Sequence, residues 1–111
     1  MKLADLVIAA LEELKAVNIR LLDVRALTTI TDYMIVASGR SARQVRALAE
    51  HVDGIVREHG IRPLGIEGLD ASEWVLIDLG DVIVHTMQPV TREFYQLEKL
   101  WEVPAHASHK I

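Results

Sequence analysis

The segment from residue 74 to residue 85 constrains the fold more than any other part of the chain. Its two halves, 74–78 and 81–85, alternate between apolar and other side chains on either side of Leu79-Gly80. Side chains of a β-strand point to opposite faces in turn, and a two-residue connection that contains glycine is typical of a β-hairpin. The segment therefore predicts two antiparallel strands, followed by a helix that begins near Pro89.

Alternation assigns the hairpin side chains to two faces of different character. One face is wholly apolar and consists of Val75, Ile77, Val82 and Val84. The other face combines an indole, aliphatic groups, carboxylates and an imidazole, and it consists of Trp74, Leu76, Asp78, Asp81, Ile83 and His85. The same faces result if the loop is Gly80-Asp81, because both registers pair odd positions with even ones. We interpret the first face as core and the second as a surface that another molecule covers.

Composition narrows the class of protein. The chain has 111 residues, half of them apolar, which fits one domain with a single core. Its formal charge is -4 and it has no basic run, so we expect a basic protein partner and little direct contact with nucleic acid. The absence of cysteine excludes disulfides and thiolate chemistry. No apolar run is long enough to span a membrane and no transit-like leader is evident, so we expect a bacterial, cytoplasmic protein.

Hydrophobic periodicity and turn residues predict the element order α-β-β-α-β-β-β-α. The expected elements are a helix that ends at 17–18, strands at 19–24 and 32–37, a helix over 41–59, an edge strand within 61–66, the two hairpin strands, and a last helix from about residue 89. This order predicts a single α/β domain over residues 1–103, with a mixed β-sheet flanked by helices. Residues 104–111 show no periodicity, and we expect them to form a flexible tail.

Two of the predicted helices carry specific signals. Ser41 and Gln44 form a capping-box pattern at the start of the second helix, and Gly60 is placed to end it. In the last helix, one stripe at helical spacing consists of Val90, Phe94, Leu97 and Trp101. We expect Phe94 and Trp101 to lie in the core. Tyr95 is one position off this stripe, and we expect it at the boundary with its hydroxyl group free to bond to a partner.

Short motifs along the chain are specific when their order and spacing are taken together. They are Asp32-Tyr33, Ala37-Ser38-Gly39, Ser41-x-x-Gln44-Val45, Glu67-Gly68, Trp74-Val75-Leu76-x-Asp78-x-Gly80-Asp81-Val82-x-Val84-His85 and Arg92-x-x-Tyr95-x-Leu97-Glu98-x-Leu100-Trp101. Over about residues 19–101 the chain resembles the ribosomal silencing factors of the Iojap group. The resemblance implies a fold similar to that of nucleotidyltransferases, without their chemistry. It also implies docking on the large ribosomal subunit, through the fourteenth protein of that subunit, and a steric block to small-subunit joining that represses translation.

A nucleotidyltransferase-like enzyme, or a nucleotide-binding protein, is the main alternative. Such an enzyme needs two carboxylates, usually one residue apart on a strand, to hold magnesium against phosphates. No predicted strand carries that pattern, and the turn at 38–41 is explained by helix capping. We expect Asp78 and Asp81 to lie directly across the hairpin from each other. They could be solvated turn residues, a docking site for lysine or arginine of a partner, or a divalent-ion or acid–base pair.

The remaining polar residues favour binding over catalysis. The histidines do not form a recognised metal motif, and they are His51, His59, His85, His106 and His109. His85 shares the mixed face with Trp74, and we expect a surface contact or an exposed imidazole. We therefore expect no catalytic residue, cofactor or metal. The expected partner-binding surface consists of Trp74, Leu76, Asp78, Asp81, Ile83, His85 and Tyr95. A homodimer that buries the same face is compatible with this interpretation.

Overall fold

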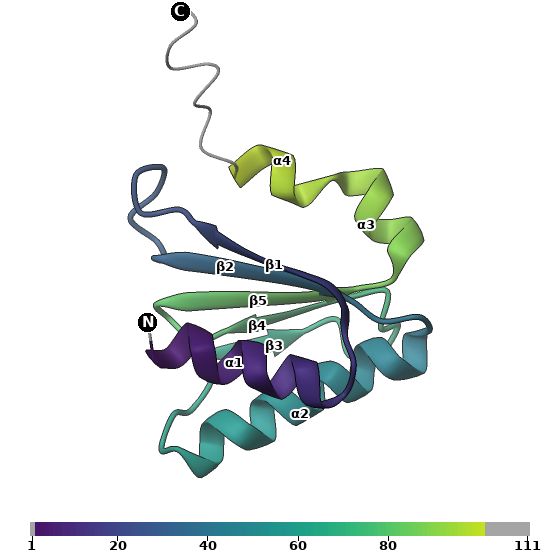
Figure 1. Ribbon diagram of the computed structural model, residues 1–111, viewed down its shortest axis with the longest axis horizontal. Helices are drawn as coiled ribbons and strands as arrows, with labels where there is room; N and C mark the ends of the chain where they lie inside the picture. Colours follow the sequence, from purple (N-terminus) through teal and green to yellow (C-terminus); the bar gives the residue numbers. More distant parts are fainter. Residues whose placement is uncertain (1, 102–111) are drawn as a thin grey trace, which may run out of the picture.

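The computed structural model of the protein describes residues 2–101, which form one mixed β-sheet between helical layers (Figure 1). The elements in chain order are α1 (Lys2–Glu13), β1 (Val17–Asp23), β2 (Tyr33–Ser38), α2 (Ala42–Glu58), β3 (Gly65–Glu67), β4 (Trp74–Asp78), β5 (Val82–Met87), α3 (Pro89–Tyr95) and α4 (Leu97–Trp101). The strand order is β1-β2-β5-β4-β3. Strands β2 and β5 are parallel, and the other neighbouring pairs are antiparallel. The predicted fold class is confirmed. The expected tail, 104–111, lies outside the described residues.

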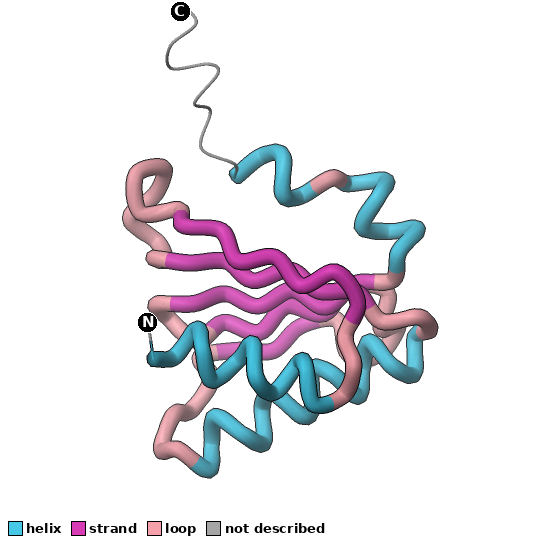
Figure 2. The backbone as a smooth tube through the Cα atoms, in the orientation of Figure 1, coloured by secondary structure: helices cyan, strands magenta, loops and turns pink. Residues whose placement is uncertain are grey.

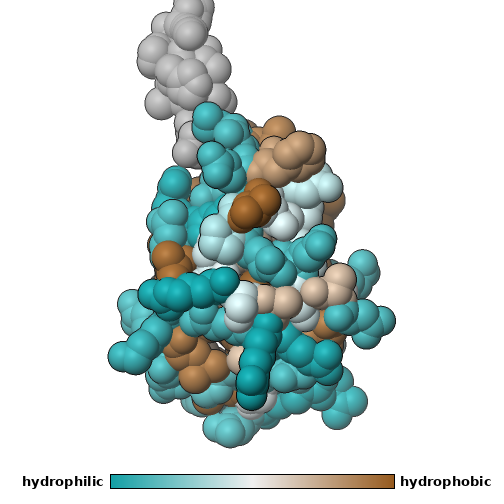
Figure 3. All heavy atoms as spheres, turned by 90° about the vertical axis from the view of Figure 1, so that its right-hand side faces the viewer, coloured by the Kyte–Doolittle hydropathy of each residue, from teal (hydrophilic) through white to brown (hydrophobic). Residues whose placement is uncertain are grey.

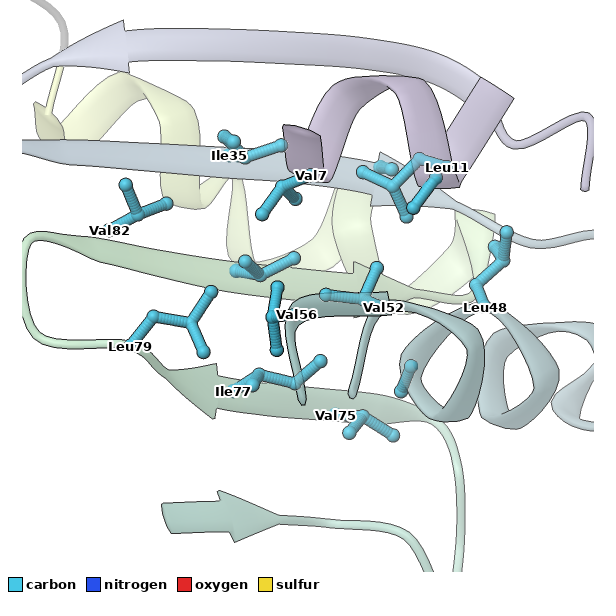
Figure 4. Packing of buried hydrophobic residues seen from close by; sticks show 14 of the residues in the cluster. Val7, Leu11, Ile35, Leu48, Val52, Val56, Val75, Ile77, Leu79 and Val82 are labelled. Carbon is cyan, nitrogen blue, oxygen red and sulfur yellow. The ribbon is translucent and has the colours of Figure 1, made fainter. Parts of the chain in front are cut away.

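The larger hydrophobic core lies between the sheet and the helices α1 and α2. These two helices run along one face of the sheet, whereas α3 and α4 lie over the other face (Figures 1 and 2). Side chains from both helices meet the sheet in this core, among them Val7, Leu11, Leu48, Val52 and Val56 (Figure 4). The apolar hairpin face lies here too, with Val75, Ile77, Val82 and Val84 all fully buried. The prediction that this face is core is therefore confirmed.

A smaller hydrophobic cluster lies on the opposite face of the sheet. Its buried members are Leu22, Met34, Val36, Met87 and Leu97 of β1, β2, β5 and α4, together with Val24, which follows β1. Trp74, Ile83 and Trp101 pack against it from its margin. The mixed face of the hairpin is therefore not a free surface along its whole length, because the segment that follows β5 covers part of it.

The first helix ends earlier than the sequence predicted. α1 stops at Glu13, and Lys15 takes a left-handed conformation with φ 60°. Val17 and Asn18, expected to end the helix, already belong to β1. The register with β2 shifts between Val17 and Arg20, and Asn18 within this irregularity also has a positive φ of 55°. Asparagine tolerates this conformation better than most residues, which suits Asn18 to the irregular position within β1.

Local side-chain bonds fix the start of α2. Ser41 Oγ accepts a hydrogen bond of 3.1 Å from the Gln44 N–H group, as expected of an N-cap residue. The Gln44 side chain accepts from the N–H group of Arg40 at 2.7 Å, one residue before the position in a standard capping box. It also donates to the carbonyl of Leu14 at 3.2 Å, which connects the start of α2 to the end of α1. Gly60 follows the helix with φ +82°, as predicted.

The last helix is divided, and this overturns one predicted core residue. Gln96 is left-handed with φ 48°, so α3 ends there and α4 begins in a new direction. A single stripe cannot continue through such a break. Leu97 is buried and Trp101 packs at the margin of the smaller cluster, but Phe94 is 78% exposed. The expectation that Phe94 lies in the core is wrong.

Replacement by alanine should change the stability of the protein in opposite directions at two glycines. Gly68 has φ +94°, and a Cβ atom there would clash with the carbonyl oxygen of Trp74. Gly68→Ala should lower the free energy of unfolding by about 1–3 kcal/mol, because both strain and a backbone clash result. Gly54 lies inside α2 with open space around it, so Gly54→Ala should raise stability by about 0.5–1 kcal/mol. Urea unfolding of both variants checks this, and equal effects would contradict it.

Candidate functional site

The hairpin turn places its two aspartates apart. Asp78 pairs with Ile83, and the Leu79 N–H group donates to the Val82 carbonyl at 2.9 Å, so the two-residue loop is Gly80-Asp81. Asp78 Oδ1 accepts a 2.9 Å hydrogen bond from the Gly80 N–H group and stabilises the turn. Asp81 is exposed within the loop. The expectation that these carboxylates face each other is wrong, because the register is one of the two that alternation alone could not separate.

The Asp81 main chain connects this turn to the neighbouring loop. Its carbonyl oxygen accepts hydrogen bonds of 3.0 Å from the N–H groups of both Asp32 and Tyr33. These bonds fix the loop against the start of β2 and leave the Asp81 side chain on the outside. A shared metal or acid–base role for Asp78 and Asp81 therefore has no support in their geometry. Within residues 2–101, no group of three histidine, aspartate or glutamate side chains is arranged to hold a metal ion.

Trp74 and His85 are diagonal neighbours on β4 and β5, and a side-chain hydrogen bond connects them. The indole Nε1–H group donates to Nδ1 of His85 at 2.9 Å, and the ring centroids are 5.9 Å apart. Trp74 is half-buried, whereas His85 is only 3% exposed. The expectation of an exposed imidazole is wrong. Alternation gave the correct face, but the indole and the helical segment after β5 cover this part of it.

Aromatic side chains continue from this pair onto α3. The Tyr95 ring lies 5.0 Å from the indole of Trp74, and the Phe94 ring meets Tyr95 edge-on at 5.0 Å. Phe94, Tyr95 and Trp74 form what we call the aromatic row. Tyr95 is 53% exposed, in agreement with its predicted boundary position. Phe94 was assigned to the core by helical spacing, but α3 buries Arg92 and turns the face that carries Val90 and Phe94 to solvent.

The open part of the mixed face lies beside the aromatic row. Leu76, Asp78 and Ile83 are half-buried there. A shallow hollow of about 270 Å³ is lined by Glu67, Gly68, Trp74 and Leu76. We define the candidate surface as the aromatic row together with Leu76, Asp78, Asp81 and Ile83. Figure 3 views the end of the molecule near α3, where hydrophobic side chains gather over the helical segment among hydrophilic ones.

A buried ion pair holds α3 and α4 in place. Arg92 donates from Nε and Nη2 to Glu98 Oε2, at 3.0 and 2.7 Å, and from Nη1 to Ser38 Oγ on β2 at 2.9 Å. Burial by itself would raise the pKa of Glu98, but the hydrogen bonds and charge of Arg92 outweigh this and the pKa is lowered. Sequence analysis assigned Arg92 no role beyond its place in a motif. Its contacts hold α3, the helix that contributes Phe94 and Tyr95 to the aromatic row.

Together these features define a single α/β domain, with aromatic and acidic groups displayed beside a half-covered sheet. Its described helices include none long and apolar enough to cross a membrane. The chain matches the family model described as "Ribosomal silencing factor during starvation" over residues 1–110. It belongs to the ribosomal silencing factor family.

Individual relatives agree with this assignment. The chain is 46% identical over 100 residues to a ribosomal silencing factor of Chromobacterium violaceum, covering 90% of this chain and 82% of the relative. A crystal structure from the same organism superimposes with a TM-score of 0.89 at 44% identity, covering 94% of this chain and 88% of the other. A mouse protein named for mitochondrial assembly of the ribosomal large subunit is 34% identical over 100 residues, which are 87% of this chain and 44% of that protein.

The buried imidazole predicts a specific loss of stability in acid. Burial lowers the pKa of His85 from 6.5 to about 4. Between these pH values the unfolded chain binds a proton that the folded chain does not. The free energy of unfolding should therefore fall as the pH falls from 6.5 towards 4, by up to about 1.4 kcal/mol per pH unit from this group.

The matched variant is His85→Asn, which does not titrate in this range. Chemical unfolding of both proteins between pH 4 and 8 gives the difference in slope, and contributions from other groups are common to both. The slope between pH 4 and 6.5 should be shallower in His85→Asn. Parallel stability curves would contradict the assignment of a neutral, buried His85.

Proposed function

We propose that this chain binds the large ribosomal subunit through its fourteenth protein and blocks association with the small subunit, so that translation is repressed in the bacterial cytoplasm. Membership of the silencing-factor family supports the regulatory role. The name of the mouse relative supports the choice of the large subunit. The observation that carries the proposal is the candidate surface, on which exposed aromatic rings adjoin half-buried aliphatic and acidic side chains.

The chemistry of the candidate surface suits a protein partner with a basic patch. Tyrosine and tryptophan are enriched at the centres of interfaces because they combine a large apolar area with a polar group. The rings of Trp74 and Tyr95 lie 5.0 Å apart at an angle of 50° in the row, and Leu76 and Ile83 extend the apolar area beside them. Asp78 and Asp81 lie at the turn, and Glu67 borders the hollow. This acidic margin would select a partner with lysine or arginine at matching positions.

The proposed mechanism is steric and needs no reaction. A docked domain of 12.4 kDa occupies space beside its binding site on the subunit surface. If that space is needed by the small subunit, binding of one excludes the other, and the degree of repression follows the fraction of large subunits that are occupied. Repression then depends only on the affinity for the large subunit. Substitutions at the candidate surface should therefore reduce repression to the extent that they reduce this affinity.

The test of this proposal is sedimentation with separated ribosomal subunits. The protein should pellet with large subunits, not with small ones, and should lower the yield of joined ribosomes. Trp74→Ala should weaken binding by at least tenfold, because a central aromatic often contributes about 2 kcal/mol or more to an interface. Leu14→Ala is the matched control, since Leu14 is 37% exposed directly after α1, on the face of the sheet opposite to α3 (Figure 1).

Two results would reject the proposal. The first is equal retention on both subunits, or on neither. The second is normal binding by Trp74→Ala, which would reject the surface even if the subunit preference holds. Circular dichroism and thermal unfolding of each variant are needed beside the binding data, because Trp74 also packs at the margin of the smaller cluster.

Charge reversal tests the acidic margin separately. Asp81 is the better position, because its side chain is exposed, whereas Asp78 accepts the hydrogen bond that stabilises the turn. Asp81→Lys should weaken binding by about tenfold, and binding of the unaltered protein should weaken as salt rises, since exposed charges are screened over about 10 Å at 0.1 M salt. Glu58→Lys makes the same charge change on exposed α2. If both variants bind alike, net charge explains the effect and Asp81 has no local role.

A further inference from the structure

His85 is an unusual residue for its place in the sheet. It lies at the centre of the sheet on β5, between Val36 of β2 and Leu76 of β4, and it is 3% exposed. Its Nδ1 atom accepts the hydrogen bond from Trp74, so in the neutral ring the proton is on Nε2. No group within residues 2–101 accepts a hydrogen bond from this Nε2–H group, which is buried. A buried donor without a partner lowers stability.

Packing alone does not account for an imidazole at this position. The smaller cluster on this face consists otherwise of aliphatic and thioether side chains, with Val36 and Met87 fully buried near His85 on the same face. A leucine of similar volume could fill the site without an unpaired donor. Among residues 2–101, the one side-chain hydrogen bond of His85 is with the indole of Trp74. The imidazole is therefore best explained by its effect on the position of that indole.

We propose that His85 is a positioning residue that holds the Trp74 indole in the orientation that the partner recognises. This inference rests on the proposed function, because Trp74 is taken as the central contact. The indole has two anchors: its N–H group is bonded to Nδ1 of His85 at 2.9 Å, and its ring lies 5.0 Å from the Tyr95 ring. A hydrogen bond and a ring contact together restrict the rotation of the indole more than either contact does alone.

Fixing the indole before binding raises affinity without adding a contact. A side chain that is free in the unbound protein loses rotational freedom when it binds, and this loss opposes association. Trp74 is half-buried, so without its hydrogen bond the indole could turn towards solvent. His85 itself is too deeply buried to touch a partner. Its lowered pKa keeps Nδ1 available as an acceptor throughout the neutral range.

Two substitutions separate this role from a purely structural one. His85→Asn keeps an acceptor, because the asparagine Oδ1 atom reaches about the position of Nδ1. His85→Leu fills the space but cannot accept a hydrogen bond. We expect His85→Leu to bind isolated large subunits about tenfold more weakly, as expected for a lost hydrogen bond and a freed side chain. Its melting temperature at pH 7 should be equal or higher, because the unpaired buried donor is removed. His85→Asn should bind nearly as tightly as the unaltered protein.

The NMR signal of the indole N–H group tests the Trp74–His85 hydrogen bond directly, without ribosomal subunits. The chain has two tryptophans, so Trp101→Phe leaves the Trp74 indole signal alone in the proton–nitrogen NMR spectrum. In His85→Leu this signal should move upfield and exchange faster with water, and in His85→Asn it should stay close to its original position. Unchanged exchange in His85→Leu would overturn the inference, because the indole would then be held by something else.

Binding data can also overturn the inference without touching the proposed function. If Trp74→Ala loses binding while His85→Leu binds normally, the surface stands and His85 has no positioning role. If His85→Asn and His85→Leu lose binding equally, the hydrogen-bond acceptor is not what matters, and the inference fails. If Trp74→Ala itself binds normally, the proposed surface fails, and the inference fails with it.

Discussion

The pairing of β5 with β2 and β4 is the interaction on which the rest of the structure depends. β5 is the central strand, and it is parallel to β2 and antiparallel to β4. Its Val82 and Val84 side chains enter the larger core, which α1 and α2 must cover to keep the apolar face from water. The opposite side of the same strand carries Ile83, His85 and Met87, so one strand determines both the core and the character of the candidate surface.

The helices after β5 cover only part of that second side of the sheet. Polar contacts determine which part they cover. After β5 the chain has only two short helices, α3 and α4, with a left-handed residue between them. The Ser38–Arg92–Glu98 contacts hold these helices over β1 and β2. Replacing a buried ion pair by apolar residues is often neutral for stability, but removing one partner is not. The pair therefore specifies where the helices lie, and with them where the sheet remains open beside Trp74.

The features that could be predicted from the sequence are those that local periodicity and capping residues determine. The faces of β4 and β5, the N-cap at Ser41 and the stop at Gly60 each depend on residues close in the chain, and each was predicted. The position of Asp81 depended on a choice between two registers with identical faces, which only backbone hydrogen bonds could decide. The burial of His85 depends on contact with the indole of Trp74, and the exposure of Phe94 depends on which face of α3 packs on the sheet. Both are tertiary features that composition and spacing do not predict, so those two residues were misplaced.

Trp74 shows how the fold and the proposed binding role share one side chain. The indole packs at the margin of the smaller cluster, donates to a buried acceptor and lies beside the ring of Tyr95, and it remains partly exposed. A fully buried tryptophan could not contact a partner, and a fully exposed one would lose more freedom on binding. The intermediate position supplies apolar area in a fixed orientation, at the cost of an unpaired imidazole donor beneath it. A buried polar group that lowers stability is thus best explained by the side chain it holds at the surface.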